Sequence, residues 1–519
     1  MKAFKLPYEH YFPNFEESKI LEFMSIKTFI SIPLFCITLV ACSTKKTELT
    51  WNKSLNKIGS QSSPKASDLN KDGVLDIIMG AGENEYQASK KGIIALNGVD
   101  GQILWEHPCT DQVYGSATLL DVTNDGIEDV FIGGRSNQFY AINGATGESI
   151  WQWKYDYEND PVLKYAKFNF QNAVTIPDQN EDGLEDLLVV TGGNAKAEPN
   201  TMKNRYPGIL MILSSTDGKV IAADSMPDGM ESYMAPLYFE QPDGSQNIVF
   251  ATGGETINGS LYKTSLASLK NNNISSAEVL ASDTSGHGFV APSVAVDFNH
   301  DNFLDIAAIS HGSYIFCIDG KTSKSLWQKN IPNTESSNGF AIGNFNNDDT
   351  PDLFTFVSEG VWPESKGSVQ IMLDGKTGET LYQNNLGCTG FSSPVIYDLN
   401  DDGIDEAIIS INEYDCDQGF IGSTKLGVST RLVALDFRAK TVRTIDELKR
   451  FKNIFSTPYI GDMDNDGYLD IVHCQYFSPD TDLLLFLGMQ VKRISTSIKM
   501  NKPVAWGEYM GTQGKGVFR

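Results

Sequence analysis

Histidine and basic residues are scarce in this sequence, and each shortage argues against a class of function. Only six histidines occur among 519 residues, and no pair has the spacing of a zinc finger or of an H-E-x-x-H metalloprotease. Lys and Arg total 41 against 66 Asp and Glu, which gives a formal net charge of −25 at pH 7. That charge opposes binding to phosphate backbones, so we expect no nucleic-acid partner. Hydrophobic residues still make up 41%, enough for a large folded core.

The N-terminal region has the pattern of an export signal. Ser25-Ile26-Lys27 supplies a short basic start, and residues 29–40 form an apolar run too short for a confident membrane-spanning helix. The run ends in Leu39-Val40-Ala41-Cys42, which resembles the bacterial lipobox, whose cysteine is lipidated. An ordinary signal peptide that contains a chance cysteine is the alternative.

The resemblance to a lipobox predicts how this part of the chain is divided. Residues 1–41 would be a signal region, in which Met24 is an alternative start of translation. Residues 42–48 would be a tether lipidated at Cys42. Ser43 is similar to the residue that usually follows the cysteine in outer-membrane lipoproteins. We therefore expect a lipid-anchored protein of the bacterial cell envelope, at the outer membrane, whose periplasmic or surface facing stays open.

One acidic pattern recurs seven times: Asp-x-Asx-x-Asp-Gly-x-x-Asp followed by an apolar run rich in β-formers. The loops begin 53, 57, 119, 47, 54 and 64 residues apart. The doubled interval predicts a unit without its loop, and residues 235–250 have the same strand–turn–strand shape without the acidic residues. The expected ligand residues are Asp68, Asn70, Asp72 and Asp76; Asp121, Thr123, Asp125 and Asp129; Asp178, Asn180, Asp182 and Asp186; Asp297, Asn299, Asp301 and Asp305; Asn344, Asn346, Asp348 and Asp352; Asp398, Asn400, Asp402 and Glu406; Asp462, Asp464, Asp466 and Asp470.

Each unit also carries a second signature, a strand ending in Asx-Gly and a final strand that often holds tryptophan, as at Trp105, Trp151 and Trp327. Four short strands per unit without helical periodicity predict an all-β β-propeller, with eight four-stranded blades and seven as the alternative. Leu49-Thr-Trp51 looks like a detached fourth strand, so we expect it to complete the last blade and close the ring. Residues 49–519 would then form a single propeller domain.

The loops suit calcium. Oxygen side chains at positions 1, 3, 5 and 9 with a sharp turn at position 6 match a hard cation that takes six to eight oxygen ligands. An EF-hand is excluded because position 12 of the first loop is Met79, inside a strand. We expect up to about seven ions, all structural.

These loops and their strands resemble the FG-GAP (VCBS-like) repeats of integrin α-subunit propellers, and the tryptophan-bearing halves resemble quinoprotein (PQQ-like) repeats. The resemblance implies a propeller with calcium between the first two strands of a blade, on the face opposite the ligand face. It does not imply a particular ligand. Pyrroloquinoline-quinone dehydrogenases typically have an adjacent cysteine pair beneath the cofactor, and this chain has no Cys-Cys, which disfavours that activity.

The opposite face is expected to carry the function. Long, varied loops gather there, at residues 83–91, 154–169, 194–206, 359–366 and 413–430, and short segments bearing one aromatic residue lead into the first strands. These aromatics are Tyr114, Phe170, Tyr233, Phe289, Phe340, Phe391 and Phe455, which are expected mainly to pack near the axis. The ligand-face candidates are Tyr86, Tyr165, Tyr206, His287, Trp362 and Tyr414.

From these residues we expect a binding protein rather than an enzyme, whose partner is a glycan or another envelope protein. The alternative is a carbohydrate-active enzyme, a polysaccharide lyase or hydrolase, with a site near the axis and His287 as its best-placed base. His311 and His473 lie at strand ends and are interpreted as structural.

Five cysteines follow Cys42. Cys388 precedes the first strand of its unit and Cys416 follows the second, so antiparallel pairing brings both to the same end. We therefore predict a Cys388–Cys416 disulfide that leaves Cys109 free. Cys317 and Cys474 sit in apolar runs and are expected to be buried.

Overall fold

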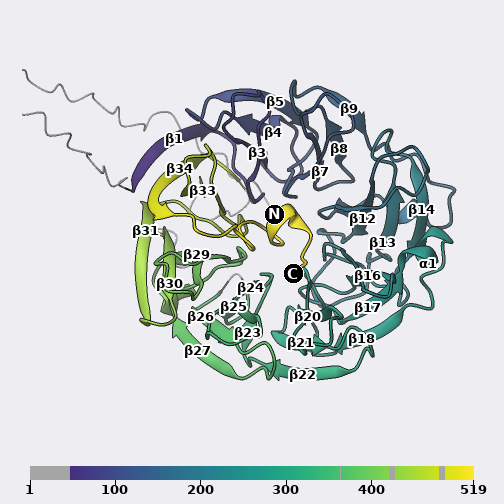
Figure 1. The fold of residues 1–519 in the computed structure, drawn as a ribbon. Coiled ribbons are helices and arrows are strands. Elements are labelled where there is room, and N and C mark those ends of the chain that lie inside the picture. The colour runs from purple at the N-terminus through teal and green to yellow at the C-terminus, as the bar shows by residue number, and fades with distance from the viewer. Residues whose placement is uncertain (1–46, 363, 420–426, 479–484) are drawn as a thin grey trace, which may run out of the picture. The chain divides into compact units, whose positions relative to one another are not determined.

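Short apolar strands separated by tight turns fold into a ring of eight blades, shown down its axis in Figure 1. The computed structural model describes residues 47–362, 364–419, 427–478 and 485–519. The prediction of an all-β, eight-bladed propeller is confirmed, and the seven-bladed alternative is excluded.

The first four blades run clockwise through the purple and teal part of Figure 1. Their strands are β2 (Lys65–Ser67), β3 (Asp76–Gly80), β4 (Ser89–Leu96) and β5 (Ile103–Cys109); β6 (Thr118–Leu120), β7 (Asp129–Gly133), β8 (Phe139–Ile142) and β9 (Ser149–Gln152); β10 (Asn169–Phe170), β11 (Val174–Ile176), β12 (Asp186–Gly192), β13 (Ile209–Leu213) and β14 (Val220–Ser225); β15 (Leu237–Glu240), β16 (Gln246–Ala251), β17 (Gly259–Ser265) and β18 (Glu278–Asp283). The fourth of these is the unit that lacks an acidic loop. Helix α1 (Leu266–Lys270) joins its last two strands, and the Ser265 side chain accepts from the Ser268 N–H at the helix start.

The remaining blades complete the ring. Their strands are β19 (Val294–Val296), β20 (Asp305–Ile309), β21 (Tyr314–Ile318) and β22 (Ser325–Asn330); β23 (Thr334–Glu335), β24 (Ala341–Gly343), β25 (Asp352–Glu359), β26 (Gly367–Leu373) and β27 (Thr380–Asn385); β28 (Val395–Tyr397), β29 (Glu406–Glu413), β30 (Ser429–Asp436) and β31 (Thr441–Lys449); β32 (Tyr459–Gly461), β33 (Tyr468–Phe477), β34 (Gly488–Lys499) and β1 (Glu48–Asn56). Single 3-10 turns occur at Leu163–Tyr165, Cys416–Gln418 and Thr512–Gly514. Within the described residues, no helix is both long and apolar enough to cross a membrane.

The burial pattern of the strands follows from their place in a blade. All five residues of β3 are buried, whereas the outer strand β5 alternates between exposed residues and residues that are buried or half-buried. Second strands are covered on both faces by neighbouring blades and therefore read as continuous apolar runs. Outer strands have solvent on one side, so exposed side chains alternate with more buried ones along them, with a period of two.

Tryptophans of four outer strands, Trp51, Trp105, Trp151 and Trp327, each bind one blade to the next. The indole N–H of Trp105 donates to the Gly144 carbonyl of the following blade at 2.7 Å, and Trp327 donates to Gly375 at 2.8 Å. Gly147, with a φ of 74°, packs directly under the Trp105 ring, where a Cβ would lie 2.7 Å from ring atoms. The recurring Asx-Gly…Gly-x-x-x-Trp pattern is thus an interblade contact.

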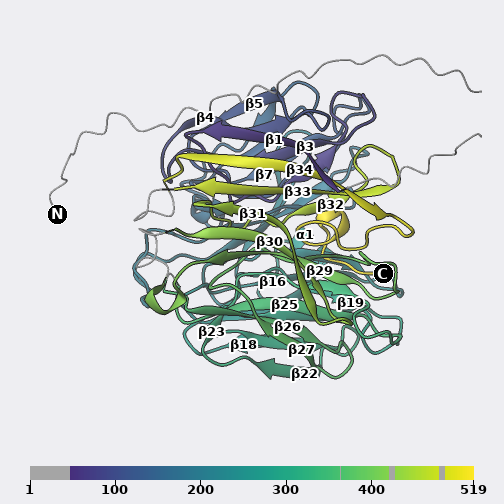
Figure 2. The ribbon, with the colours of Figure 1, turned by 90° about the vertical axis from the view of Figure 1, so that its left-hand side faces the viewer.

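The N-terminal strand closes the ring. Strand β1 pairs antiparallel with β34 as the outermost strand of the last blade, side by side with it in Figure 2. The Trp51 indole then donates to the Gly98 carbonyl of the first blade at 2.8 Å. Closure therefore uses the same bond as every other tryptophan junction, and it removes the open sheet edges.

The C-terminal tail crosses the axis. The Trp506 carbonyl accepts from the Ile396 N–H, the Gly507 carbonyl from the Ile460 N–H, and the Gly516 carbonyl from the Ala295 N–H, each bond 2.8–2.9 Å long. The tail thus binds the innermost strands of three blades, and the Trp506 side chain is buried. Figure 1 shows this yellow segment in the centre of the ring.

Candidate functional site

A pocket of about 500 Å³ lies at the axis of the face that carries the long loops. We call it the axial pocket. It is lined by residues of the loops between second and third strands, such as Glu85, Arg135, Asn194 and Glu255, and by residues of the segments that lead into first strands. This volume lies in the range of pockets that bind small molecules.

Aromatic rings form one part of the wall: Tyr114, Tyr233, Trp362, Phe391 and Phe455. Trp362 meets Phe391 edge to face at 5.3 Å, and Phe391 stacks on Phe455 at 5.8 Å between ring centroids. The Tyr114 hydroxyl donates to the Phe170 carbonyl, and burial raises the pKa of Tyr114 to about 12. The segments that lead into first strands therefore supply both the aromatic wall of the pocket and part of the core. Phe170, Phe289 and Phe340 are buried in that core, as expected.

Side-chain amides form a second part of the wall: Gln61, Asn169, Gln171, Asn172 and Asn194. Several are held by the protein itself. The Gln171 amide donates to the Tyr114 hydroxyl at 3.2 Å, and the Asn172 Oδ1 accepts from the Ser116 N–H at 3.1 Å. An amide both donates and accepts hydrogen bonds, so this wall suits a ligand rich in hydroxyl groups.

Two arginines of the pocket pair with carboxylates. Arg135 contacts Glu85 at 2.9 Å, and Arg205 pairs with the fully buried Glu231. Burial raises the pKa of Glu231, although the Arg205 guanidinium opposes the shift. The pairs neutralise charge that would otherwise be costly to bury.

A histidine–carboxylate cluster adjoins the pocket. His287 lies before β19, His311 follows β20, and Glu335 ends β23 of the next blade. The three side chains each place one possible ligand atom within 4.8 Å of the others, and His311 Nε2 lies 3.5 Å from Glu335 Oε2. Burial lowers the pKa of His311, but the hydrogen bond and charge of Glu335, the charge of Glu255 and the Ser336 carbonyl together raise it by more, so the net direction is upward. Although burial opposes ionisation of Glu335, His311, the Trp362 backbone N–H and His287 together bring the pKa of that carboxyl below its usual value.

Of the six ligand-face candidates from the sequence, Trp362 lines the axial pocket. Tyr165 stacks on Tyr206 at 5.8 Å with Lys167 over the Tyr206 ring, and these residues form a separate rim. Tyr86 is 42% exposed beneath the Lys196 ammonium. The Tyr414 hydroxyl donates to the Ser365 carbonyl, which ties two loops together, and His287 belongs to the histidine–carboxylate cluster.

The disulfide predicted between Cys388 and Cys416 is present. The backbone carbonyl of Tyr414 lies 3.3 Å from Cys388 Sγ, so this bridge and the Tyr414 hydroxyl fix the same loop. Cys109 is free and buried, as are Cys317 and Cys474. Cys42 lies outside the described residues.

The seven acidic loops join first and second strands, on the face opposite the axial pocket. In the first loop, Asp68 accepts from the Asp72 and Gly73 N–H groups at 3.1 and 3.0 Å, and Asp72 accepts from the Val74 N–H at 2.9 Å. Both bonds of the first aspartate recur at Asp121, Asp297, Asp398 and Asp462. These bonds fold the donor oxygens back over one loop, an arrangement that fits a calcium ion.

The carboxylate at position 9 has a role that the sequence did not reveal. Asp76 is buried, and it accepts from the Leu69 N–H at 2.9 Å and from the Gly98 N–H at 2.8 Å. Burial raises its pKa to about 6 despite these bonds. Asp129, Asp305 and Asp352 make the same pair of contacts in their blades. This side chain therefore joins the acidic loop to the turn after the third strand, which in the blades of Asp76, Asp129 and Asp352 also receives the neighbouring tryptophan.

The last loop differs from the others. Asp462, Asp464 and Asp470 place oxygens within 4.8 Å of one another, but Arg493 from β34 donates to Asp464 at 2.6 Å and to Asp470 at 2.8 Å. Arg493 is 2% exposed. A buried guanidinium thus pairs with two of the expected calcium ligands, so the donor set of this loop does not fit an added ion. Arg493 could have been noticed as a charge within a strand-like run.

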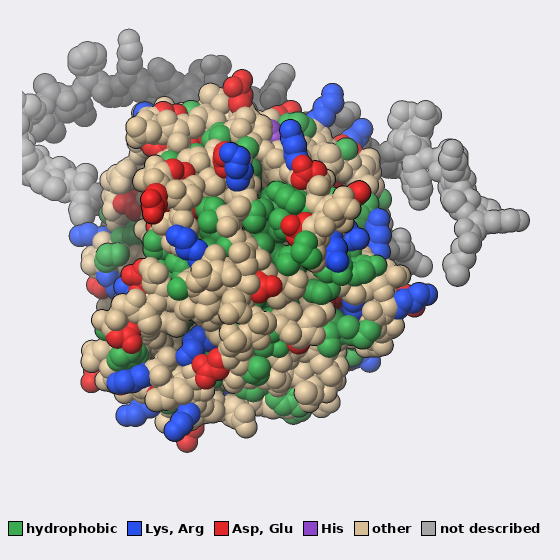
Figure 3. Space-filling model, turned by 90° about the vertical axis from the view of Figure 1, so that its right-hand side faces the viewer, with side chains coloured by type: hydrophobic (Ala, Val, Ile, Leu, Met, Phe, Trp, Pro, Cys, Tyr) green, Lys and Arg blue, Asp and Glu red, His purple; other side chains and the backbone are tan. Residues whose placement is uncertain are grey.

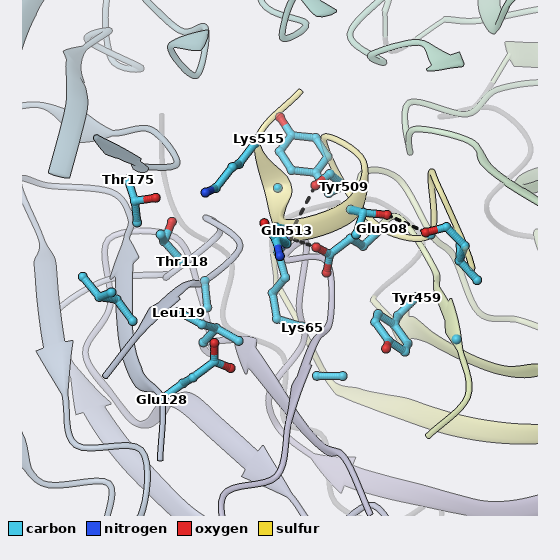
Figure 4. Close-up of a pocket in the computed structure, with 18 of the residues that line it drawn as sticks. Lys65, Thr118, Leu119, Glu128, Thr175, Tyr459, Glu508, Tyr509, Gln513 and Lys515 are labelled. Atoms are coloured by element: carbon cyan, nitrogen blue, oxygen red, sulfur yellow. Dashed lines mark hydrogen bonds and ion pairs between the residues drawn. The ribbon is translucent and has the colours of Figure 1, made fainter. Parts of the chain in front are cut away.

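A second pocket, of about 730 Å³, lies at the other end of the axis and is drawn in Figure 4. Lys65 projects into it and pairs with Glu508 of the tail at 2.9 Å. Tyr509 lines both pockets, so the tail separates them.

The outer side of the ring around α1 mixes acidic, basic and hydrophobic side chains, as Figure 3 shows.

Comparison with known proteins gives a family match. The model of the FAM234A/B β-propeller family matches residues 68–395, from the first acidic loop to the start of β28 and more than half of the chain. Mouse and human FAM234B are each 23% identical to this chain over 176 and 180 residues, which cover 32% of this chain and 27% of those proteins. Mouse FAM234A is 21% identical over 187 residues, or 32% of this chain and 33% of that protein. The matched region thus spans a third or less of these relatives.

Solved structures share the fold. A quinohemoprotein alcohol dehydrogenase from Pseudomonas putida superposes with a TM-score of 0.54 at 10% identity, over 90% of this chain and 79% of that one. An exotype rhamnogalacturonan lyase superposes with a TM-score of 0.51 at 11% identity, over 88% and 75%. At these identities the likeness shows the propeller alone.

Proposed function

This chain belongs to the FAM234A/B β-propeller family, and from that premise we propose that it is a non-catalytic, calcium-stabilised propeller that binds a glycan in its axial pocket. The observation that carries the proposal is the pairing of aromatic rings with ordered side-chain amides in one cavity of about 500 Å³. Sugars present apolar C–H faces and many hydroxyls, which such a wall contacts by stacking and by hydrogen bonds.

The size of the pocket favours a glycan over a protein partner. A stable protein–protein interface needs about 800 Å² from each partner, which a concave axial cavity does not provide. A short oligosaccharide fits into a cavity of this volume. An envelope protein that docks on the surrounding loops is the alternative partner.

The charges of the pocket support binding rather than hydrolysis. Glycoside hydrolysis commonly uses two carboxyl groups that flank the scissile bond. Of the two carboxylates that line the pocket, Glu85 already pairs with Arg135, which leaves Glu255. This supports a binding role over the hydrolase that the sequence left as one alternative.

The proposal is tested by binding of a panel of neutral and acidic oligosaccharides, measured by calorimetry. Trp362→Ala removes a ring of the pocket, and Tyr86→Ala removes a more exposed ring of the same face outside it. We expect Trp362→Ala to weaken binding at least tenfold, about 1.4 kcal/mol, while Tyr86→Ala leaves it unchanged. Equal effects of the two substitutions would refute the assignment of the pocket.

Calcium is the structural part of the proposal. Six loops, all but the one that Arg493 contacts, would each hold an ion through side-chain oxygens of the positions identified in the sequence. Each ion would offset repulsion among carboxylates and stabilise the native state by mass action.

Attachment to the bacterial outer membrane through Cys42 also belongs to the proposal, and it rests on the lipobox-like residues Leu39–Cys42. Mass spectrometry of the mature protein tests it. We expect the first peptide to begin at Cys42 and to carry acyl chains. Peptides from residues before Cys42 in the mature protein would contradict the anchor.

A further inference from the structure

We propose that His287, His311 and Glu335 form a binding site for a first-row transition-metal ion, zinc in the first instance, in the wall of the axial pocket. The site goes beyond the calcium loops and beyond the glycan proposal. Two imidazoles and one carboxylate are a ligand set that zinc accepts with a further position left open. Imidazole nitrogen does not suit calcium, which takes oxygen ligands.

The distances approach those of a metal site. Ligand atoms that lie about 2.0–2.1 Å from a tetrahedral zinc are about 3.3 Å from each other. His311 Nε2 and Glu335 Oε2 are 3.5 Å apart, and His287 places its nearest ligand atom within 4.8 Å of both. His287 is half-buried on a loop, and its ring centroid lies 5.4 Å from that of His311, so we expect its side chain to move closer when an ion binds.

Hydrogen bonds orient both imidazoles for metal binding. His287 Nδ1 lies 2.7 Å from the Glu255 carbonyl, and His311 Nδ1 lies 3.1 Å from the Ser336 carbonyl. A carbonyl only accepts, so each Nδ1 carries the proton, and in the neutral ring each Nε2 is left with its lone pair. Metal-binding histidines are typically oriented in this way by a carbonyl or carboxylate.

Each of the three ligands is also held by a residue of the axial pocket. The Glu255 carbonyl accepts from His287, the Ser337 hydroxyl lies 3.3 Å from His311 Nδ1, and the backbone N–H of Trp362 donates to Glu335 Oε2 at 2.7 Å. Glu255, Ser337 and Trp362 all line that pocket. An ion at this place would therefore border the pocket, with its open coordination position available to water or to a bound molecule.

Cobalt(II) is the probe, because its visible absorption reports a low-coordinate nitrogen and oxygen environment, and zinc is added afterwards in competition. The full chain is titrated in excess calcium, so that the acidic loops are saturated. We expect one equivalent of cobalt to bind with strong visible bands and to be displaced by one equivalent of zinc. Neither ion needs an oligosaccharide, so the result is independent of glycan binding.

His287→Gln and Glu335→Gln are the test variants, and His107→Gln is the matched control. His107 is also half-buried, with Nδ1 3.0 Å from the Gly147 carbonyl, but it belongs to no ligand cluster among the described residues. We expect each test variant to lose the cobalt bands and to bind zinc at least about tenfold more weakly, since even outer-shell partners contribute that much. His287→Gln leaves the buried His311–Glu335 pair intact, so it keeps the test valid if Glu335→Gln does not fold.

Two outcomes would overturn the site. The first is that the wild-type chain binds no stoichiometric cobalt or zinc at micromolar concentration. The second is that His107→Gln reduces binding as much as His287→Gln does. In either case the three residues form an ion pair with a neighbouring histidine and nothing more.

Discussion

Arg493 provides the sharpest test of how the acidic loops stabilise the propeller. Its guanidinium contacts Asp464 and the fully buried Asp470, and it also donates to the Gly98 carbonyl of the first blade at 2.9 Å. Arg493→Met keeps much of the side-chain volume but leaves Asp470 buried beside two other carboxylates. Removing one partner of a buried ion pair costs about 3–5 kcal/mol, so we expect a loss of that size in calcium-free buffer.

Calcium should reduce this loss. Without the guanidinium, Asp462, Asp464 and Asp470 offer oxygens within 4.8 Å of one another to an added ion. Binding of calcium at 100 times its dissociation constant restores about 2.7 kcal/mol. The measurement is denaturant-induced unfolding of the wild type and the variant, with calcium and with excess chelator, and the difference between the two proteins is compared at each condition.

Arg438→Met is the matched control. Arg438 lies 3.3 Å from Asp402 of another acidic loop, but its side chain is 51% exposed. An exposed pair contributes about 0–1 kcal/mol, so we expect little change at either calcium level. A deficit of Arg493→Met below 1 kcal/mol, or one that calcium leaves untouched, would refute the idea that the guanidinium takes the place of an ion.

Three further outcomes follow from other contacts. Trp105→Phe removes the indole N–H and leaves the Gly144 carbonyl without its donor, so we expect thermal unfolding to report a loss of about 1–3 kcal/mol. Burial, together with the Lys492 ammonium, lowers the pKa of His473 to about 4. The unfolded chain then binds the extra proton first as the pH falls, so stability should decrease from about pH 6.5 to pH 4, and His473→Gln should flatten that part of the profile. Cys388→Ser should increase proteolysis near Cys416 without increasing it in the other blades, and mapped cleavage sites would show both results.

The repeat in the sequence was sufficient to predict most of the fold. The spacing of the acidic loops predicted eight blades, including the loopless blade of β15–β18, and the isolated Trp51 segment predicted the closure by β1. These features are local and recur in register, so each copy supports the others. The disulfide also followed from local topology, because Cys388 and Cys416 flank two adjacent strands.

The candidate sites depended on contacts between units that no repeat encodes. Glu335 comes from a different blade than His311, and His311 alone resembles a structural histidine. Arg493 reaches the last acidic loop from β34, and in the sequence it lies more than twenty residues beyond Asp470. The tail crosses the axis through backbone hydrogen bonds, which depend little on side-chain identity. Each of these contacts becomes visible only when the ring is closed.

The most direct measurement of the central proposal is a crystal structure of the protein with the tightest-binding oligosaccharide of the panel. We expect the sugar in the axial pocket, with one ring against Trp362 and hydroxyls bonded to Asn172 and its neighbouring amides. A sugar bound instead on the Tyr165–Tyr206 stack, with solvent in the axial pocket, would contradict the proposal. So would the failure of every oligosaccharide of the panel to bind.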